Sequence, residues 1–233
     1  VFHYTAENEA DSLRILQDPN ALVSSHYLVG MENIYQLVDL DKRAYHAGYS
    51  YWQGRHGLND TSIGIEIVQE VSCDAQTKTC DYPPYPMQQI DNLITVLSEI
   101  KQRHPNIKAT AYVGHQDIAP ARKQDPGPLF PWQYLAEQGF GAWYETDDYQ
   151  AIRNNLAGKS PSQARFYQGL ALYGYPEITD DNAEAIIRAF QTHFTPEEIT
   201  GQITPASYAA LMALLKKYKP RQYQQLMTEP NLL

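Results

Sequence analysis

The segment GHQDIAPARKQDPG, from Gly114 to Gly127, is the most informative part of this sequence. It brings an imidazole, a lysine and carboxylates into a stretch whose glycines and prolines favour neither helix nor strand. His115 and Asp125 belong to the residue types that zinc prefers, and they require one more protein ligand to form a site. We predict that this segment is an irregular loop shaped by a metal site.

His3 is the candidate for the third ligand, because it lies in VFHYTA, where a short apolar strand runs into a polar turn. Two histidines and one aspartate leave the fourth position of a tetrahedral zinc ion open to water, which is typical of catalytic sites. The spacing of His115 and Asp125 matches no helical or zinc-finger signature, so spacing alone leaves the ligand set open.

Length, composition and charge limit the class of protein. The chain has 233 residues, of which 43% are hydrophobic, enough for one large domain or for a medium and a small one. Residues 1–150 hold 10 Lys/Arg and 20 Asp/Glu, and residues 151–233 hold 8 and 7. An acidic first half without a basic stripe argues against nucleic acid as a partner. No apolar run is long enough to span a membrane, and VFHYT does not resemble a signal peptide, so membrane attachment would come only through residues upstream of this sequence.

The first 142 residues alternate between strand and helix patterns. Glu66 lies on the opposite face of its predicted strand from Ile65 and Ile67, where a cleft can use it. We therefore expect an α/β domain with a mixed central sheet flanked by helices on both faces. The predicted strands are VFHYT, SHYLVG, NIYQLVD, SIGIEIVQ and TAYVG, the last of them leading into His115, and the predicted helices span residues 8–17 and 86–104.

Residues 159–220 predict a small C-terminal module of three helices. Helix start signals occur at a capping box beginning with Ser160 and Pro161, at Asp181, and at Thr204 followed by Pro205. Residues 143–158 are expected to be a polar linker and residues 221–233 a tail. Because the three helices have their own apolar faces, we expect a chain ending near 145 to keep its metal and its activity.

Five segments occur in the order VFHYTA, SSHYLV, AYHAG, SIGIEI and GHQDIAPARKQDPG. Together they resemble the type 2 N-acetylmuramoyl-L-alanine amidases over roughly the first 140 residues. The resemblance implies the fold of these amidases, shared with peptidoglycan-recognition domains, and one zinc ion per chain held by His3, His115 and Asp125. The C-terminal helices resemble the three-helix peptidoglycan-binding module, although GYPEITDDN replaces its usual Gly-rich connection and leaves carbohydrate binding open.

The same resemblance implies an activity and roles for further residues. The substrate would be peptidoglycan or its fragments, cut between N-acetylmuramic acid, or its anhydro form, and L-Ala of the stem peptide. Glu66 would act as general base, and Lys123, in the K-x-D-P-G pattern, would stabilise the oxyanion. His46 in AYHAG would line the substrate cleft. The simpler alternatives are a solvated strand glutamate for Glu66 and a surface lysine for Lys123.

Other functional classes explain the sequence less well. A non-catalytic peptidoglycan-recognition protein is the main alternative, since some domains of this fold lack a zinc ligand and only bind. Here all three ligand positions are filled, which favours an enzyme. No G-x-S-x-G or HExxH motif occurs, and glycoside hydrolysis by paired carboxylates would leave the histidine and aspartate set unexplained.

Several residues keep two interpretations. Asp117 either orients a metal ligand or caps the loop, and His193 is expected to be solvated. The spacing of Cys73 and Cys80 fits a disulfide and two free thiols almost equally. The resemblance implies a monomer in the periplasm of the bacterial envelope and allows an anchor to the outer membrane as a lipoprotein. Because that compartment is oxidising, it favours the disulfide.

Overall fold

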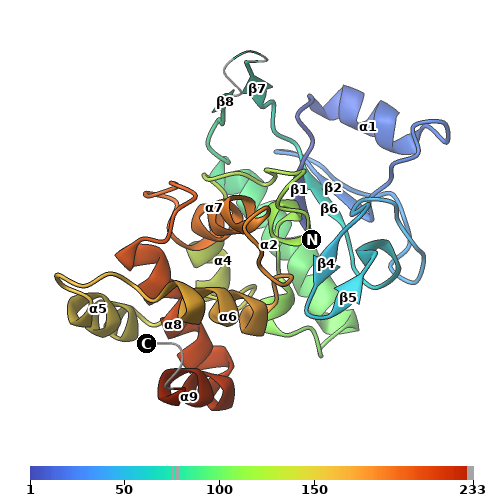
Figure 1. The fold of residues 1–233 in the computed structure, drawn as a ribbon. Helices are drawn as coiled ribbons and strands as arrows, with labels where there is room; N and C mark the ends of the chain where they lie inside the picture. Colours follow the sequence, from blue (N-terminus) through green and yellow to red (C-terminus); the bar gives the residue numbers. More distant parts are fainter. Residues whose placement is uncertain (75, 77–78, 230–233) are drawn as a thin grey trace.

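A mixed sheet forms the centre of the N-terminal part of the protein (Figure 1). The computed structural model describes residues 1–74, 76 and 79–229. Strands β1, β6 and β2 run parallel, and β3 pairs with β2 as an antiparallel hairpin. The mixed sheet and four of the five predicted strands are confirmed, each strand shorter than expected. In sheet order the strands are β1 (Phe2–Tyr4), β6 (Ile65–Ile67), β2 (Tyr27–Val29) and β3 (Ile34–Gln36).

The register of the sheet separates an apolar face from a polar one. His3 is the partner of Glu66, which is in turn the partner of Leu28 on the other side. Because successive side chains of a strand alternate between faces, His3 and Glu66 share one face, while Phe2, Ile65 and Ile67 point to the opposite one. The latter side chains are buried in a common core.

Helix α2 (Met87–Arg103) covers the apolar face of the sheet. The buried amide of Gln89 donates hydrogen bonds to the carbonyl oxygens of Val29 (3.1 Å) and Val68 (2.7 Å), which ties the helix to the ends of two strands. Helix α1 (Glu9–Gln17) begins after Asn8, whose side chain accepts a hydrogen bond from the Asp11 amide. Both predicted helices are confirmed within about one residue at each end.

The segment TAYVG, predicted as a strand, is only partly extended. Its first residues belong to the 3-10 helix η2 (Ala109–Ala111), and the rest makes a single bridge between Gly114 and Phe2. The following segment, predicted to be irregular throughout, begins with the one-turn helix α3 (His115–Ile118). The prediction failed because this part of the chain borders the sheet with one residue of pairing instead of a full strand.

Two small hairpins lie outside the main sheet. Strands β4 (Tyr51–Trp52) and β5 (Arg55–His56) form one, and β7 (Ser72–Cys73) and β8 (Cys80–Asp81) form the other, which projects from the molecule (Figure 1). Cys73 and Cys80 form a disulfide across the second hairpin, so the oxidised alternative is correct in this structure. The remaining short elements are η1 (Leu58–Asp60) and α4 (Trp132–Glu137).

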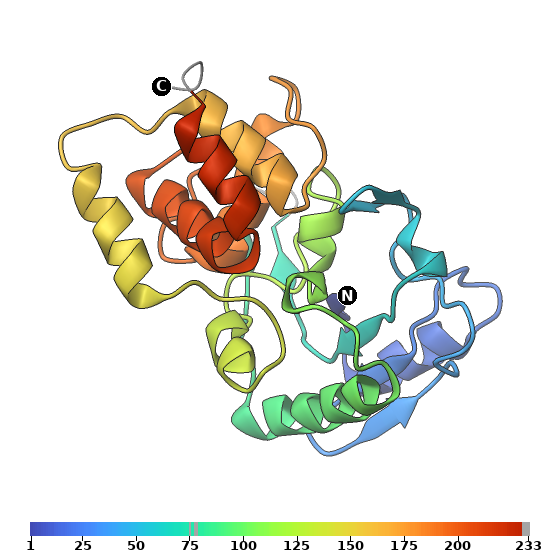
Figure 2. The same cartoon turned by 90° about the horizontal axis from the view of Figure 1, so that it is seen from below.

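The C-terminal part is helical, as predicted (Figure 2). Helices α6 (Gln163–Tyr173), α7 (Ala183–Phe194) and α8 (Pro205–Tyr218) are the three expected ones. Thr204 caps α8 by accepting the Ser207 amide, as its start signal suggests. Helix α6, however, is capped by Ser162 instead of Ser160, so the predicted capping box is wrong.

The expected linker and tail both contain helices. Helix α5 (Thr146–Asn155) occupies most of 143–158, and α9 (Pro220–Thr228) begins the tail. Tyr149 and Ile152 of α5 pack against the helical core, and Leu226 of α9 is buried in it. The sequence of α5 is polar, so it is the packing of these few apolar side chains, and not an obvious periodicity, that holds the helix in place.

The two parts of the chain share one hydrophobic core. Trp52 of β4 lies edge-on to Tyr173 and Tyr175, with ring centroids 6.0 and 4.9 Å apart, and the Gln53 amide donates to the Gly174 carbonyl at 2.9 Å. Buried side chains from both parts belong to one continuous core. The division into a domain of residues 1–142 and a domain of residues 159–220 stays a prediction. Among the described residues, no helix is both long and apolar enough to cross a bilayer.

Candidate metal centre and catalytic cleft

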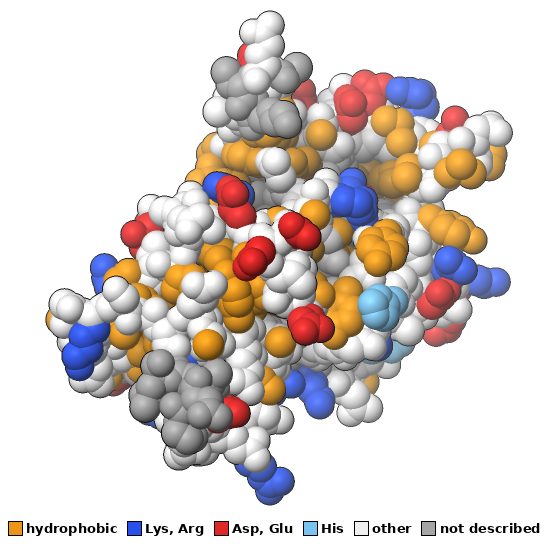
Figure 3. All heavy atoms as spheres, in the orientation of Figure 1, with side chains coloured by type: hydrophobic (Ala, Val, Ile, Leu, Met, Phe, Trp, Pro, Cys, Tyr) orange, Lys and Arg blue, Asp and Glu red, His pale blue; other side chains and the backbone are white. Residues whose placement is uncertain are grey.

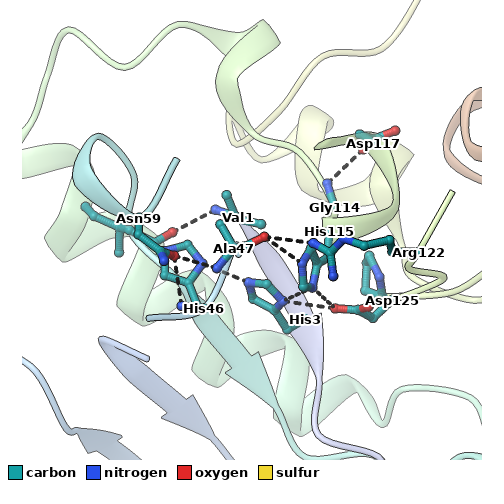
Figure 4. Close-up of polar contacts among 12 residues, drawn as sticks. Val1, His3, His46, Ala47, Asn59, Gly114, His115, Asp117, Arg122 and Asp125 are labelled. Carbon is teal, nitrogen blue, oxygen red and sulfur yellow. Dashed lines mark hydrogen bonds and ion pairs between the residues drawn. The ribbon is translucent and has the colours of Figure 1, made fainter. Parts of the chain in front are cut away.

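Three predicted ligands meet at one point beside the sheet (Figure 4). His3 comes from β1, His115 is the first residue of α3, and Asp125 follows in the next loop. The His3 Nδ1 atom lies 2.9 Å from His115 Nδ1 and 2.9 Å from Asp125 Oδ2, and His115 Nδ1 lies 3.0 Å from the same oxygen. All three residues are buried.

This triangle of donor atoms fits a tetrahedral metal ion. Ligands about 2.0–2.1 Å from tetrahedral zinc lie roughly 3.3 Å from one another, close to the spacing seen here. Burial, and then the nearby His115, lower the pKa of His3 to about 3. Burial acts to raise the pKa of Asp125, but hydrogen bonds from His115 and His3 outweigh it and hold this pKa below its ordinary value. Neutral imidazole and ionised carboxylate are the forms that bind metals.

The outer nitrogen of His3 faces His46. His3 Nε2 lies 3.0 Å from His46 Nδ1, and His46 Nε2 lies 3.3 Å from the Ser62 hydroxyl, which donates to the Leu58 carbonyl at 2.7 Å. His46 thus lines the cleft, as predicted, and also contacts a ligand, which the sequence did not indicate. A Cβ atom on Gly64 would collide with the His46 ring, which explains the glycine in SIGIEI.

The outer nitrogen of His115 faces a backbone carbonyl. His115 Nε2 lies 3.2 Å from the oxygen of Ala47, which also accepts a hydrogen bond from Arg122 Nη2 at 3.2 Å. Arg122 donates to the Tyr49 carbonyl as well, and Asn59 Oδ1 accepts the amides of His46 and Ala47. These contacts fix the AYHAG loop against the ligand. Such a partner fixes the tautomer and orientation of a metal-binding imidazole.

Asp117 caps the loop instead of orienting a ligand directly. Its Oδ2 atom accepts the Gly114 amide at 2.8 Å, which closes the turn that carries His115. Of the two interpretations left open by the sequence, the capping one is seen (Figure 4).

Glu66 and Lys123 line the same cleft as the three ligands, in a space of about 590 Å³. The Glu66 Oε2 atom is buried without a hydrogen-bond partner among the described residues. Burial, with a smaller contribution from Asp125, raises the pKa of Glu66 well above its ordinary value, and Lys123 opposes this rise. A carboxyl whose pKa is raised by burial is a stronger base than an exposed one, which suits proton transfer.

Apolar side chains border the mouth of this cleft. Ile15, Leu16, Val23 and Tyr45 line it, and hydrophobic groups gather between the projecting hairpin and α1 on the face shown in Figure 3. A larger cavity of about 930 Å³ contains none of the six candidate residues. The candidate residues therefore converge in the smaller cleft, and such a convergence of polar and titratable groups marks it as the candidate active site.

His193 is not solvated, contrary to the prediction. It is buried, stacks on Trp132 with ring centroids 3.6 Å apart, and places Nδ1 2.8 Å from Asp117 Oδ2. Its sequence context at the end of a helix suggested exposure, but its contacts come from residues far along the chain.

Comparisons with known proteins show the family to which the chain belongs. The sequence profile of a family described as N-acetylmuramoyl-L-alanine amidase matches residues 1–128. The N-acetylmuramoyl-L-alanine amidase AmiD of Escherichia coli K12 is 42% identical, over 94% of this chain and 82% of its own length. AmpD of Enterobacter cloacae, a 1,6-anhydro-N-acetylmuramyl-L-alanine amidase, is 44% identical over 42% of this chain and 47% of its own.

Solved structures resemble nearly the whole chain. AmpDh3 from Pseudomonas aeruginosa superimposes with a TM-score of 0.87 and 36% identity, covering 94% of this chain and 91% of its own. AmiD from E. coli, in complex with anhydro-N-acetylmuramic acid-L-Ala-D-γ-Glu-L-Lys, gives a TM-score of 0.83 and 40% identity, covering 93% and 88%. With its motifs in order, its ligands assembled and its length matched by these relatives, this chain belongs to the N-acetylmuramoyl-L-alanine amidase family.

Proposed function

We propose that this protein hydrolyses the amide bond between the lactyl group of N-acetylmuramic acid, or its anhydro form, and L-Ala of the stem peptide. The observation that carries the proposal is the convergence of His3, His115 and Asp125 in a cleft that Glu66 and Lys123 also line. Relatives support the substrate class, because the AmpDh3 structure was also solved with an anhydromuramic pentapeptide and AmiD with an anhydromuropeptide.

We infer one zinc ion per chain, held by His3, His115 and Asp125. Two imidazoles and a carboxylate suit zinc and leave room for a non-protein ligand. Zinc held by these residues would supply Lewis acidity for the amide carbonyl and would make water a nucleophile at neutral pH. His46 and the Ala47 carbonyl hold the two imidazole rings in the orientation that points both Nδ1 atoms inward.

The remaining chemistry falls to Glu66 and Lys123. Glu66 takes the proton from the attacking water and later delivers it to the departing nitrogen of L-Ala. Its raised pKa suits both steps, because a weakly acidic carboxyl is the stronger base and the more readily reprotonated acid. Lys123 presents an ammonium group to the oxygen on which negative charge develops.

Defined muropeptides test this proposal. Incubation with anhydro-N-acetylmuramyl peptides should release free stem peptide with an N-terminal L-Ala, identified by mass spectrometry. A chelator should abolish release, and added zinc should restore it. Glu66→Gln should keep its zinc and lose the reaction. Binding of the muropeptide without cleavage by the zinc-loaded protein would instead support the alternative, a recognition protein.

The compartment and the oligomeric state follow as parts of the proposal. We propose that the protein is a monomer and works in the bacterial envelope, on the periplasmic side, where residues upstream of this sequence could supply an anchor to the outer membrane. The Cys73–Cys80 disulfide supports an oxidising compartment. Thiol alkylation of the protein taken from intact cells should find both cysteines blocked, and analytical ultracentrifugation should give the mass of one chain. Reduced cysteines in cells would count against this location.

A further inference from the structure

The carboxylate of Asp117 is completely buried between the N-terminal part of the chain and the C-terminal helices. Three donors surround it. The Gly114 amide comes from its own turn, while the Tyr175 hydroxyl lies 2.6 Å from Oδ1 and His193 Nδ1 lies 2.8 Å from Oδ2. A carboxylate buried this deeply is stable only when its oxygens accept hydrogen bonds. Two of the three donors come from the helical module.

Both donors are themselves held in place. Tyr175 is buried against Trp52, and Gly174 beside it adopts φ +154° where a Cβ atom would lie 2.9 Å from Trp52 and Gln53. His193 is stacked between Trp132 and Phe194, at ring-centroid distances of 3.6 and 3.9 Å. Its Nε2 atom is buried without a partner among the described residues, so Nδ1 is the ring nitrogen that donates to Asp117.

The turn that Asp117 closes carries the metal site. His115 follows Gly114 directly, and the Gln116 amide of the same turn donates to the Asp125 carbonyl at 2.9 Å. Two of the three ligands are therefore positioned by the few residues between Gly114 and Asp117. A displaced Asp117 would shift both His115 and Asp125.

We propose that Tyr175 and His193 are positioning residues for the metal site, acting through Asp117. The helical module thus forms part of the scaffold of the catalytic cleft, in addition to any contact it makes with the cell wall. The inference rests on the proposed ligand set of His3, His115 and Asp125. It concerns the geometry of that set and not the identity of the substrate.

Tyr175→Phe in the full chain tests the first residue, because it removes one hydroxyl and keeps the ring. Tyr208→Phe is the matched control, since Tyr208 is buried in the same module, stacks on Phe166 and is not among the described hydrogen-bond partners of Asp117. We expect Tyr175→Phe to weaken zinc affinity, measured by competition with a chromogenic chelator, by roughly 10-fold or more. The visible spectrum of the Co²⁺-loaded protein should change as well. Tyr208→Phe should stay within about twofold of the wild type in affinity and leave the spectrum unchanged.

Two substitutions of His193 provide an independent test, which also applies if Tyr175→Phe fails to fold. His193→Asn retains an N–H near the position of Nδ1, and His193→Leu has a similar shape but no donor. His193→Leu should lose zinc affinity as Tyr175→Phe does, and His193→Asn should recover most of it. Equal affinities and Co²⁺ spectra within each pair would overturn the proposal. A wild-type protein that binds neither metal would overturn the ligand set with it, whereas metal binding without amide cleavage would count only against the proposed function.

Discussion

Glu66 is a carboxyl group whose ionisation is disfavoured by burial. Its folded pKa lies well above the ordinary value of 4.5. As pH rises above that value, the unfolded chain releases this proton while the folded chain retains it. The folded state then binds more protons, so its stability falls with rising pH until the folded pKa is passed.

Replacing Glu66 with glutamine should remove this penalty. Urea unfolding of the metal-free protein between pH 4.5 and 8 should show a free energy of unfolding that declines less steeply in Glu66→Gln than in the wild type. Glu70→Gln, a change at an exposed carboxyl, should keep the wild-type slope. Parallel curves for all three proteins would mean that Glu66 ionises freely in the folded state.

Lys123 is expected to act on the transition state and not on the metal. Lys123→Ala should lower kcat on the order of 10²-fold because the developing oxyanion loses its ammonium partner. Zinc content, measured by atomic emission, should remain at one ion per chain. Lys159→Ala, at an exposed lysine outside the cleft, should leave kcat unchanged. Loss of zinc from the Lys123 variant would assign this lysine a structural role.

Sequence motifs predicted the three clustered side chains His3, His115 and Asp125 and the neighbouring Glu66 and Lys123, but not the groups that contact them. The ordered segments around His3, Glu66 and Asp125 carry chemistry in their residue types. The group that faces His115 is the backbone carbonyl of Ala47, which any residue type would provide, so no side chain in the sequence indicates it. His193 contacts Asp117, which lies 76 residues earlier in the chain. Contacts of this kind depend on how distant segments pack, which a single sequence does not encode locally.

At the scale of elements, α8 depends on its first turn. The Thr204 hydroxyl accepts the Ser207 amide at 3.1 Å, and the Ser207 hydroxyl lies 3.0 Å from the Thr204 amide, which donates to it. Thr204→Ala should therefore destabilise the protein by about 1 kcal/mol in urea unfolding, while Thr204→Ser should be nearly neutral. The zinc affinity of both variants should match the wild type. A loss as small in Thr204→Ala as in Thr204→Ser would show that the cap contributes little.

Elements with strong periodicity were predictable, and those defined by packing were not. Helix α2 has a clear apolar stripe, and α8 has a proline and a capping threonine at its start. Helix α5 offers only Tyr149 and Ile152 as partly buried apolar side chains, so a polar linker was the natural interpretation. The extended segment ending at Gly114 has strand-like residues but only one paired position.

At the scale of the whole molecule, the shared core makes the C-terminal helices hard to remove. A chain ending at residue 145 would expose Trp52 and Ile118, which the core buries, and would leave Asp117 without Tyr175 and His193. We now expect this shortened chain to melt at a lower temperature and to bind zinc more weakly, the reverse of the expectation from sequence. Circular dichroism melting and a Co²⁺ titration, each beside the full chain, measure both effects. Wild-type melting and metal uptake would restore the view of two independent modules.

Parallel pairing of β1 with β6 sets His3 directly opposite Glu66. Neighbouring strands lie about 4.8 Å apart, so the spacing between the candidate ligand His3 and the candidate base Glu66 is set by the sheet and not by any loop. The chain between the two strands can lengthen or shorten without altering it. A slip of one residue, in contrast, would turn Glu66 into the core and present an isoleucine to the cleft. Loops around the cleft can therefore change in length while the spacing of His3 and Glu66 stays the same.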